Sequence, residues 1–192
     1  MRGQGTTPKI SLNAPVILGF SGVCMIALLL GYLTNHASTN AVFSVYHSSL
    51  FDPLTYVRFV GHIFGHASWE HFISNIMLIL LVGPLLEEKY GSFSISIVIL
   101  TTAIVTGIIN YILFPNIQLL GASGVVFAFI LLSSLTSFKD GTIPLTFILV
   151  TAIYIGKEIY SGIFVSDNIS NFTHILGGMV GAGFGFLMNK KY

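Results

Sequence analysis

The chain has 192 residues, of which 54% are hydrophobic and 8% are charged, and its formal net charge is +1. An ordinary soluble domain carries about 25% charged residues, so most of the surface of this protein is expected to face lipid. The near-neutral charge gives no indication of a nucleic-acid partner, and the lone cysteine, Cys24, excludes an internal disulfide framework.

Six apolar segments follow one another along the chain, each near the length that crosses about 30 Å of hydrocarbon. They cover residues 14–33, 70–86, 93–113, 123–138, 142–157 and 172–189. Polar or helix-breaking stretches separate them, among them TNHASTN, EEKYGS, FPN and SDNISN. Because the backbone must satisfy its own hydrogen bonds within a bilayer, we expect six transmembrane helices. We expect residues 1–192 to form one all-α membrane domain.

The basic residues predict how these helices are oriented, because cytoplasmic loops carry an excess of Lys and Arg. If the N-terminus is cytoplasmic, the outer segments hold Arg58 and Lys157. The inner segments then hold the remaining basic residues, which are Arg2, Lys9, Lys89, Lys139, Lys190 and Lys191. Both termini are therefore predicted to be cytoplasmic. The stretch 34–69, rich in aromatic residues and His, is predicted to be partly helical and to lie in the membrane interface.

Two Gly-x-Ser-Gly patterns, at 19–22 and 121–124, offer two candidate nucleophiles. Ser21 lies about 10 Å into the first span and has no ionisable partner at that depth. It is predicted to bond a carbonyl one turn earlier or to pack between helices. Ser123 is predicted to start the short fourth helix below the outer surface, where unpaired N–H groups can hold an oxyanion. There Gly121 would permit a tight turn, and Gly124 would permit a close helix approach.

A serine nucleophile needs a base, and His174 in the sixth span shares the outer depth of Ser123. Phe127, one turn after Ser123, is placed to hold the imidazole by stacking. Below His174, three glycines share one helical face and allow a close approach: Gly178, Gly181 and Gly185. The alternative is that His174 only bonds a carbonyl inside the bundle. An ionisable residue within a span nevertheless favours a functional site.

The segment HFISN supplies two further polar groups at the outer start of the second helix. His71 and Asn75 are four residues apart and share a face. Both can donate hydrogen bonds to a developing oxyanion, or they can simply join neighbouring helices. No Asp or Glu stands near His174 in the sequence, so the pattern predicts a Ser–His dyad and not a triad.

With these residues the chain resembles the rhomboid intramembrane serine proteases. The resemblance runs from about residue 55 to 188 and includes VRFVGHIFGHASWEHFISN, GPLLEEKYGS, GASGVVFA and HILGGMVGAGFG, in the family's order. It implies an endopeptidase in the lipid bilayer that cleaves single-span membrane proteins without a metal or cofactor. Ser123 would be the nucleophile and His174 the base. His71, Asn75 and the Ser123 N–H would form the oxyanion hole.

The resemblance also implies roles outside the dyad. His62 and His66 would make supporting hydrogen bonds in the first loop, and the fifth helix would be the substrate gate. Glu87 or Glu88 would tie the end of the second helix to a loop. Val57 stands where the family often has tryptophan, which affects the packing of the first loop. A bare six-helix core suggests a prokaryotic plasma membrane.

Three other functions stay open on the sequence alone. A membrane metalloprotease could use His62, His66 and His71, but Glu70 directly precedes His71 and no His-Glu-x-x-His occurs. A transporter or channel would show charges inside the spans or inverted repeats. A catalytically inactive rhomboid-like membrane binding protein would share the motifs but would not react with a serine-directed probe.

Overall fold

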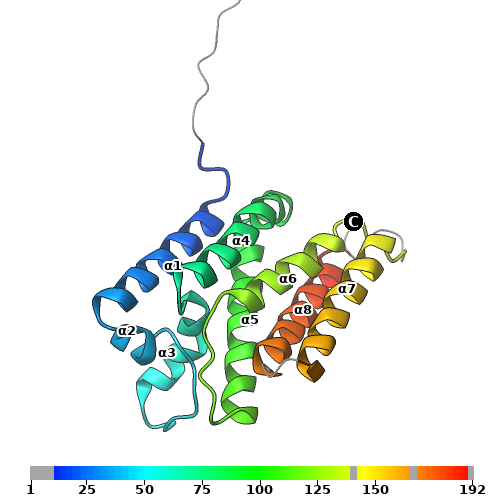
Figure 1. Cartoon of the computed structure of the whole chain (residues 1–192). Coiled ribbons are helices and arrows are strands. Elements are labelled where there is room, and N and C mark those ends of the chain that lie inside the picture. Colours follow the sequence, from blue (N-terminus) through cyan, green and yellow to red (C-terminus); the bar gives the residue numbers. More distant parts are fainter. Residues whose placement is uncertain (1–10, 139–141, 165–167, 190–192) are drawn as a thin grey trace, which may run out of the picture.

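The computed structural model describes residues 11–138, 142–164 and 168–189, and these residues form an all-α protein (Figure 1). Among these described residues, three helices are long and apolar enough to cross a membrane: α1 (Pro15–Leu33), α4 (Trp69–Tyr90) and α5 (Ser92–Leu113). The stretch between α1 and α4 holds α2 (Ala37–Ala41), α3 (Pro53–Gly61) and a 3-10 turn (His62–Phe64). The chain continues with α6 (Ser123–Ser134), α7 (Leu145–Phe164) and α8 (Asn168–Asn189).

Several helix ends differ from the sequence prediction. The end of α4 lies at Tyr90 and not at 86, α7 runs from 145 to 164 and not from 142 to 157, and α8 begins at 168 and not at 172. These helices extend through polar residues that an apolar pattern does not reach. Conversely, α6 ends at Ser134 and not at 138. Near this end the hydroxyls of Ser133 and Ser134 donate to carbonyls three residues earlier, which competes with the helical backbone pattern.

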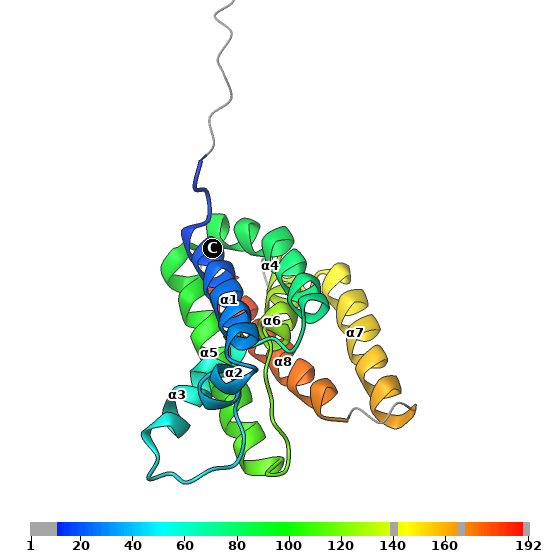
Figure 2. The ribbon, with the colours of Figure 1, turned by 60° about the vertical axis from the view of Figure 1, so that its left-hand side comes forward.

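The central element is α6, which contacts α4, α5, α7 and α8 (Figure 2). Residues 124–129 are all buried, as expected for a helix that is apolar on every side. With 12 residues, α6 is about 18 Å long, and segment 114–122 rises from the end of α5 to reach its start (Figure 1). Ser123 therefore lies inside the bundle and not at its end.

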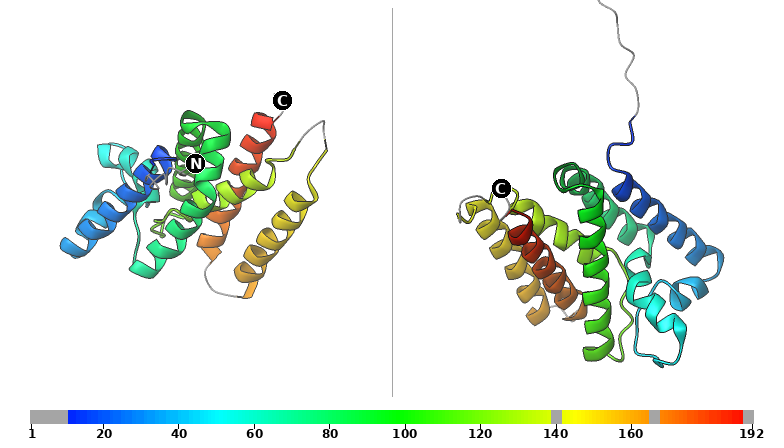
Figure 3. Two further views of the ribbon diagram at one scale, coloured as in Figure 1. Left: turned by 90° about the horizontal axis from the view of Figure 1, so that it is seen from above. Right: turned by 180° about the vertical axis from the view of Figure 1, so that it is seen from behind.

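The remaining helices surround α6, with α1 on one side and α7 on the other, as the view from above shows (Figure 3). The start of α1 and the end of α8 lie at the same end of the molecule (Figure 1). Ser21, on α1, donates its hydroxyl proton to the Ile17 carbonyl at 2.9 Å. The prediction that Ser21 bonds a carbonyl one turn earlier is therefore confirmed.

Glu87 joins three helices at the end of α4. Its buried carboxylate accepts the backbone N–H groups of Val16 and Ile17, both at 3.0 Å, and the Ser92 hydroxyl at 2.7 Å. A negative charge at the start of α1 is favourable because the unpaired N–H groups there carry partial positive charge. The family resemblance implied that either Glu87 or Glu88 ties the end of this helix to a loop. In the structure Glu87 instead ties α4 to the starts of α1 and α5.

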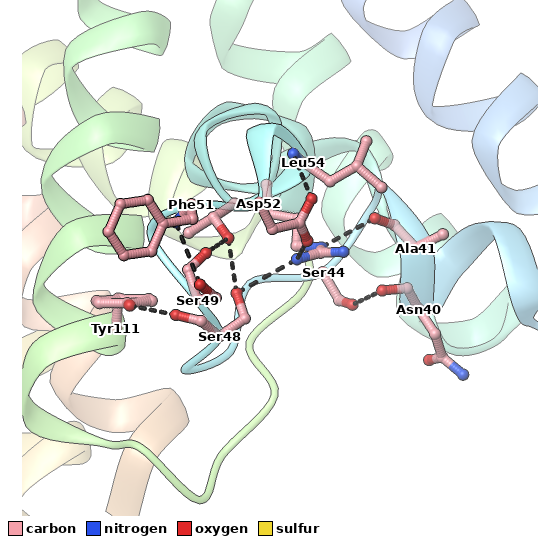
Figure 4. Close-up of polar contacts among 11 residues, drawn as sticks. Asn40, Ala41, Ser44, Ser48, Ser49, Phe51, Asp52, Leu54 and Tyr111 are labelled. Carbon is pink, nitrogen blue, oxygen red and sulfur yellow. Dashed lines mark hydrogen bonds and ion pairs between the residues drawn. The ribbon is translucent and has the colours of Figure 1, made fainter.

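The stretch between α1 and α4 is held together by Arg58, whose partners Ala41, Ser48 and Asp52 are labelled in Figure 4. This buried guanidinium donates to the Ala41 carbonyl at 2.9 Å and to Ser48 Oγ at 3.3 Å, and it pairs with Asp52 at 3.1 Å. Asp52 also caps α3 by accepting the Leu54 N–H. These bonds order the loop around a charge that would be costly to bury without partners.

The same stretch is joined to segment 114–122, which leads into α6. Val45 and Leu119 exchange both backbone hydrogen bonds, each at 2.9 Å. The Tyr111 hydroxyl, at the end of α5, donates to the Ser48 carbonyl (Figure 4). Val57, which stands where the family often has tryptophan, is 47% exposed and lines an open groove together with Tyr56 and Val60. The first loop thus braces the backbone that positions Ser123.

Candidate active site

The backbone before Ser123 turns at Gly121, whose φ is +125°. Only glycine adopts this conformation easily. The Gly121 N–H donates to the His62 carbonyl at 2.9 Å. A Cβ at Gly121 would lie 2.8 Å from both Cε1 and Nε2 of His71, so the His71 ring lies directly against the glycine. A side chain at this position would displace the ring from the start of α6.

His71 and Asn75 reach this turn from the first turns of α4. Ser68 caps α4 by accepting the His71 N–H at 3.1 Å, which fixes where the helix begins. Asn75 is buried, and its Nδ2 lies 3.8 Å from the site where a Gly121 Cβ would be. Among the described residues this amide nitrogen has no hydrogen-bond partner. A buried donor is therefore unused beside Gly121, two residues before α6 begins.

His174 lies on α8 and stacks against Phe127 of α6, with ring centroids 4.3 Å apart and ring planes within 8°. Phe127 lies one turn after Ser123, so these two residues share a face of α6. His174 is therefore held beside the face of α6 that carries Ser123. Tyr154 of α7 contacts the Phe127 ring edge-on at 5.1 Å.

The approach of α6 to α8 depends on glycines. A Cβ at Gly177 would lie 2.2 Å from the Gly124 carbonyl oxygen, and one at Gly181 would lie 2.0 Å from the Ala128 carbonyl oxygen. Both neighbours are backbone atoms, so neither glycine could be replaced without moving the helices apart. Gly178 has a looser contact, with the Leu131 side chain at 3.5 Å from its Cβ position.

Gly177 is a close-contact residue that the sequence analysis did not single out. The signal was present, because Gly177, Gly181 and Gly185 repeat at a regular spacing of four residues. Gly178 was selected instead, from the same Gly-Gly pair. It lies on the side of α8 that faces Leu131, and Gly177 faces the backbone of α6.

Two further histidines lie behind the turn. His62 Nε2 lies 3.2 Å from the Thr106 hydroxyl, and His66 Nδ1 lies 3.1 Å from the Phe64 carbonyl. Burial lowers the pKa of His62 to about 4, and burial together with the nearby His71 lowers the pKa of His66 to about 4. Within the described part of the chain, no group of three His, Cys, Asp or Glu side chains is placed to hold a metal ion.

Comparison with known proteins identifies the family of this fold. The Rhomboid domain model matches residues 53–191, which is most of the chain. The chain belongs to the rhomboid family. The α4 residues His71 and Asn75, the start of α6 and all of α8 fall inside the matched range, so this rhomboid domain contains the whole candidate site.

Relatives of this rhomboid are distant. It is 27% identical over 148 residues to Rhomboid-like protein 11, chloroplastic, of Arabidopsis thaliana, covering 69% of this chain and 52% of the relative. It is 28% identical over 155 residues to Rhomboid-related protein 2 of Mus musculus, covering 70% of this chain and 51% of the relative. It is 26% identical over 137 residues to Rhomboid protease GlpG of Haemophilus influenzae, covering 69% of this chain and 70% of the relative.

The chain thus spans about half the length of the plant and mouse relatives. One relative is named a protease and others are named rhomboid-like or rhomboid-related, so these similarities show the family and not the activity. The apolar helices α1, α4 and α5, together with the family, make this rhomboid an integral membrane protein.

Proposed function

We propose that this rhomboid is an intramembrane serine endopeptidase in which Ser123 and His174 form a catalytic dyad. The observation that carries the proposal is the flat stack of His174 on Phe127, one turn from Ser123. The glycine contacts between α6 and α8 support it, because they bring the two helices close enough for a serine hydroxyl to meet an imidazole. A serine is a weak nucleophile until a neighbouring base takes its proton.

In the proposed reaction, Ser123 Oγ attacks the carbonyl carbon of a peptide bond and His174 takes the hydroxyl proton. The tetrahedral intermediate then collapses, and His174 gives the proton to the leaving amine. A water molecule attacks the remaining ester, His174 again acts as base, and Ser123 is regenerated. Phe127 holds the imidazole plane through both halves of this cycle.

The oxyanion of the intermediate would be held by donors from α4 and α6. Asn75 Nδ2 is buried and has no partner among the described residues, so it can donate without breaking an existing bond. His71 lies against Gly121 and can donate from the same side. The Ser123 N–H, at the start of α6, is the third donor. Donors already oriented in a low-dielectric site are the most effective form of this stabilisation.

We further propose that the chain crosses the membrane six times with both termini cytoplasmic, and that α7 is the gate through which single-span membrane proteins enter. The short α6 and the rising segment 114–122 fit a site below the outer surface. Labelling from one side would test the topology, using Ser11→Cys and Ser49→Cys in a Cys24→Ala background. The two cysteines should react from opposite sides of the bilayer, and reaction from one side would contradict the topology.

The relatives come from a plant, an animal and a bacterium. They therefore give no support to the prokaryotic plasma membrane that the bare helical core suggested.

The activity is tested by cleavage of a model single-span substrate in liposomes that contain the full chain. Wild type and Ser21→Ala should cleave it, and Ser123→Ala and His174→Ala should lower the rate by at least about a thousandfold. Ser21→Ala is the matched control, since it alters the other Gly-x-Ser-Gly pattern. Cleavage that persists in Ser123→Ala would overturn the dyad. Substrate binding without cleavage by wild type would instead favour an inactive rhomboid-like binding protein.

A further inference from the structure

A cavity of about 170 Å³ lies beside the Phe127–His174 stack and is lined by residues of α6, α7 and α8. Its wall is almost entirely apolar, with Leu131 from α6, Phe147 and Ile155 from α7, and Ile175, Met179 and Ala182 from α8. The hydroxyl of Thr151 is buried at the wall and has no hydrogen-bond partner among the described residues. This space is not needed for the proposed reaction, so it requires a separate explanation.

The chemistry of the wall excludes water as a stable occupant. A buried water needs two to four polar partners, and this wall offers few polar atoms. Apolar cavities of about 150 Å³ in proteins stay dry and accept ligands the size of benzene. A void that stays empty loses dispersion contacts along its whole lining. The cavity therefore favours an apolar occupant of small cross-section.

The cavity is continuous with the lipid-facing surface between α7 and α8. Met179 and Ile155 line it and are also 64% and 37% exposed on the outside of the protein. Both residues lie well inside their helices, away from the ends. Figures 2 and 3 show α7 at the edge of the bundle, where it packs against α8 and α6. In the six-span arrangement proposed above, the medium at this seam is the hydrocarbon of the bilayer.

We propose that this cavity binds the end of a membrane-lipid acyl chain, which enters between α7 and α8 and terminates against Phe127. An acyl chain is apolar, narrow and present at this depth at very high concentration. A second copy of the protein or a whole helix is too wide for a space of this volume. The occupant would contact Tyr154 and Phe127 together, and it would thereby hold α7 against α6.

Photo-crosslinking tests the proposal without using proteolytic activity. The full chain is placed in phosphatidylcholine liposomes that contain a phospholipid with a diazirine near the end of one acyl chain, and adducts are mapped by mass spectrometry after irradiation. Leu131 and Gly178 are buried, so an adduct on either of them reports a chain inside the cavity. We expect such adducts in wild type and equally in Ser123→Ala. Their absence from wild type would overturn the proposal.

A matched pair of variants tests the location. Ala182→Leu fills the cavity, whereas Ala152→Leu adds the same bulk at an exposed position of α7. Ala182→Leu should lower the adducts on Leu131 and Gly178 by at least about fivefold, and Ala152→Leu should leave them unchanged. Equal effects of the two variants would contradict the proposal. Adducts on the exposed Leu85 of α4 report correct insertion, and Thr151→Leu replaces Ala182→Leu if that variant fails to insert.

Discussion

At the scale of single residues, the contact between Phe127 and His174 restrains the side chain that must act as base. The stack restricts the imidazole to one plane. Tyr154 of α7 supports Phe127, the other ring of the stack. The sequence predicted this contact from the spacing of Phe127 and Ser123 alone. The edge-on contact with Tyr154 could not be predicted, because it depends on how α7 is rotated about its axis.

Replacing Phe127 with Leu should lower kcat about two- to tenfold and leave KM nearly unchanged. An aromatic pair of this kind is worth about 0.5–1.5 kcal/mol beyond its buried area, and the loss falls on the orientation of the base and not on substrate binding. Phe127→Tyr keeps the ring and should retain activity near that of wild type. Steady-state cleavage of a single-span substrate measures both constants. An unchanged kcat for Phe127→Leu would show that the stack does not orient His174.

Replacing Glu87 with Gln should destabilise the protein by about 1.5–3 kcal/mol. The carboxylate accepts two backbone N–H groups of α1 and the Ser92 hydroxyl, and a neutral amide has one oxygen and weaker bonds. Glu88→Gln is the matched control, because Glu88 is exposed and adjacent. Denaturant unfolding in detergent measures the free energy of unfolding of both variants. Equal losses for the two variants would disprove the special role of Glu87.

At the scale of helices, the register between α6 and α8 determines where the dyad residues meet. Gly177 and Gly181 place α8 against the backbone of α6, and Gly178 faces a side chain. The sequence identified the small-residue face of α8 but not which member of the Gly-Gly pair makes the close contact. A helix repeat of 3.6 residues allows spacings of both three and four, so the rotation of α8 had to come from the structure.

Adding one methyl group to this interface should separate the helices. In Gly181→Ala the new Cβ would lie 2.0 Å from the Ala128 carbonyl oxygen, so we expect a loss of about 1–3 kcal/mol and a large loss of cleavage. Gly183→Ala is the control, because nothing lies within 4 Å of that Cβ position. It should be neutral or stabilising by up to about 1 kcal/mol through helix propensity. If Gly181→Ala behaved like Gly183→Ala, the close packing would be contradicted.

The first loop should make stability depend on pH. Burial lowers the pKa of His62 and His66 to about 4 in the folded protein, from an ordinary value of 6.5. The unfolded chain therefore binds protons that the folded chain does not, so this stability is complete above pH 6.5 and is lost as the pH falls toward 4.

Thermal unfolding between pH 7.5 and 4.5 measures this dependence. His62→Gln should reduce the slope of Tm against pH because it removes one of the two loop histidines whose pKa is lowered by burial. His36→Asn alters an exposed histidine and should keep the wild-type slope. An identical slope in wild type and His62→Gln would rule out His62 as a source of the pH dependence.

At the scale of the whole molecule, composition and hydropathy predicted an all-α membrane protein, and the resemblance of motifs such as GASGVVFA and HILGGMVGAGFG indicated the rhomboid family. The order of the apolar segments gave the approximate position of each helix. Helix ends were missed where the backbone continues through polar residues, as at the end of α4, where Glu87 is buried by contact with α1. The bond between Val45 and Leu119 and the cavity beside His174 arise from contacts between distant segments, and no local pattern encodes them.

The central claim is that Ser123 is a nucleophile made reactive by His174. Its most direct test is reaction of the full chain, in liposomes, with a fluorophosphonate probe, followed by mass spectrometry to locate the modified serine. We predict a single adduct on Ser123, lowered at least about a hundredfold in His174→Ala and unaffected in Ser21→Ala. A wild-type protein that stays unmodified, or that reacts equally well without His174, would contradict the account.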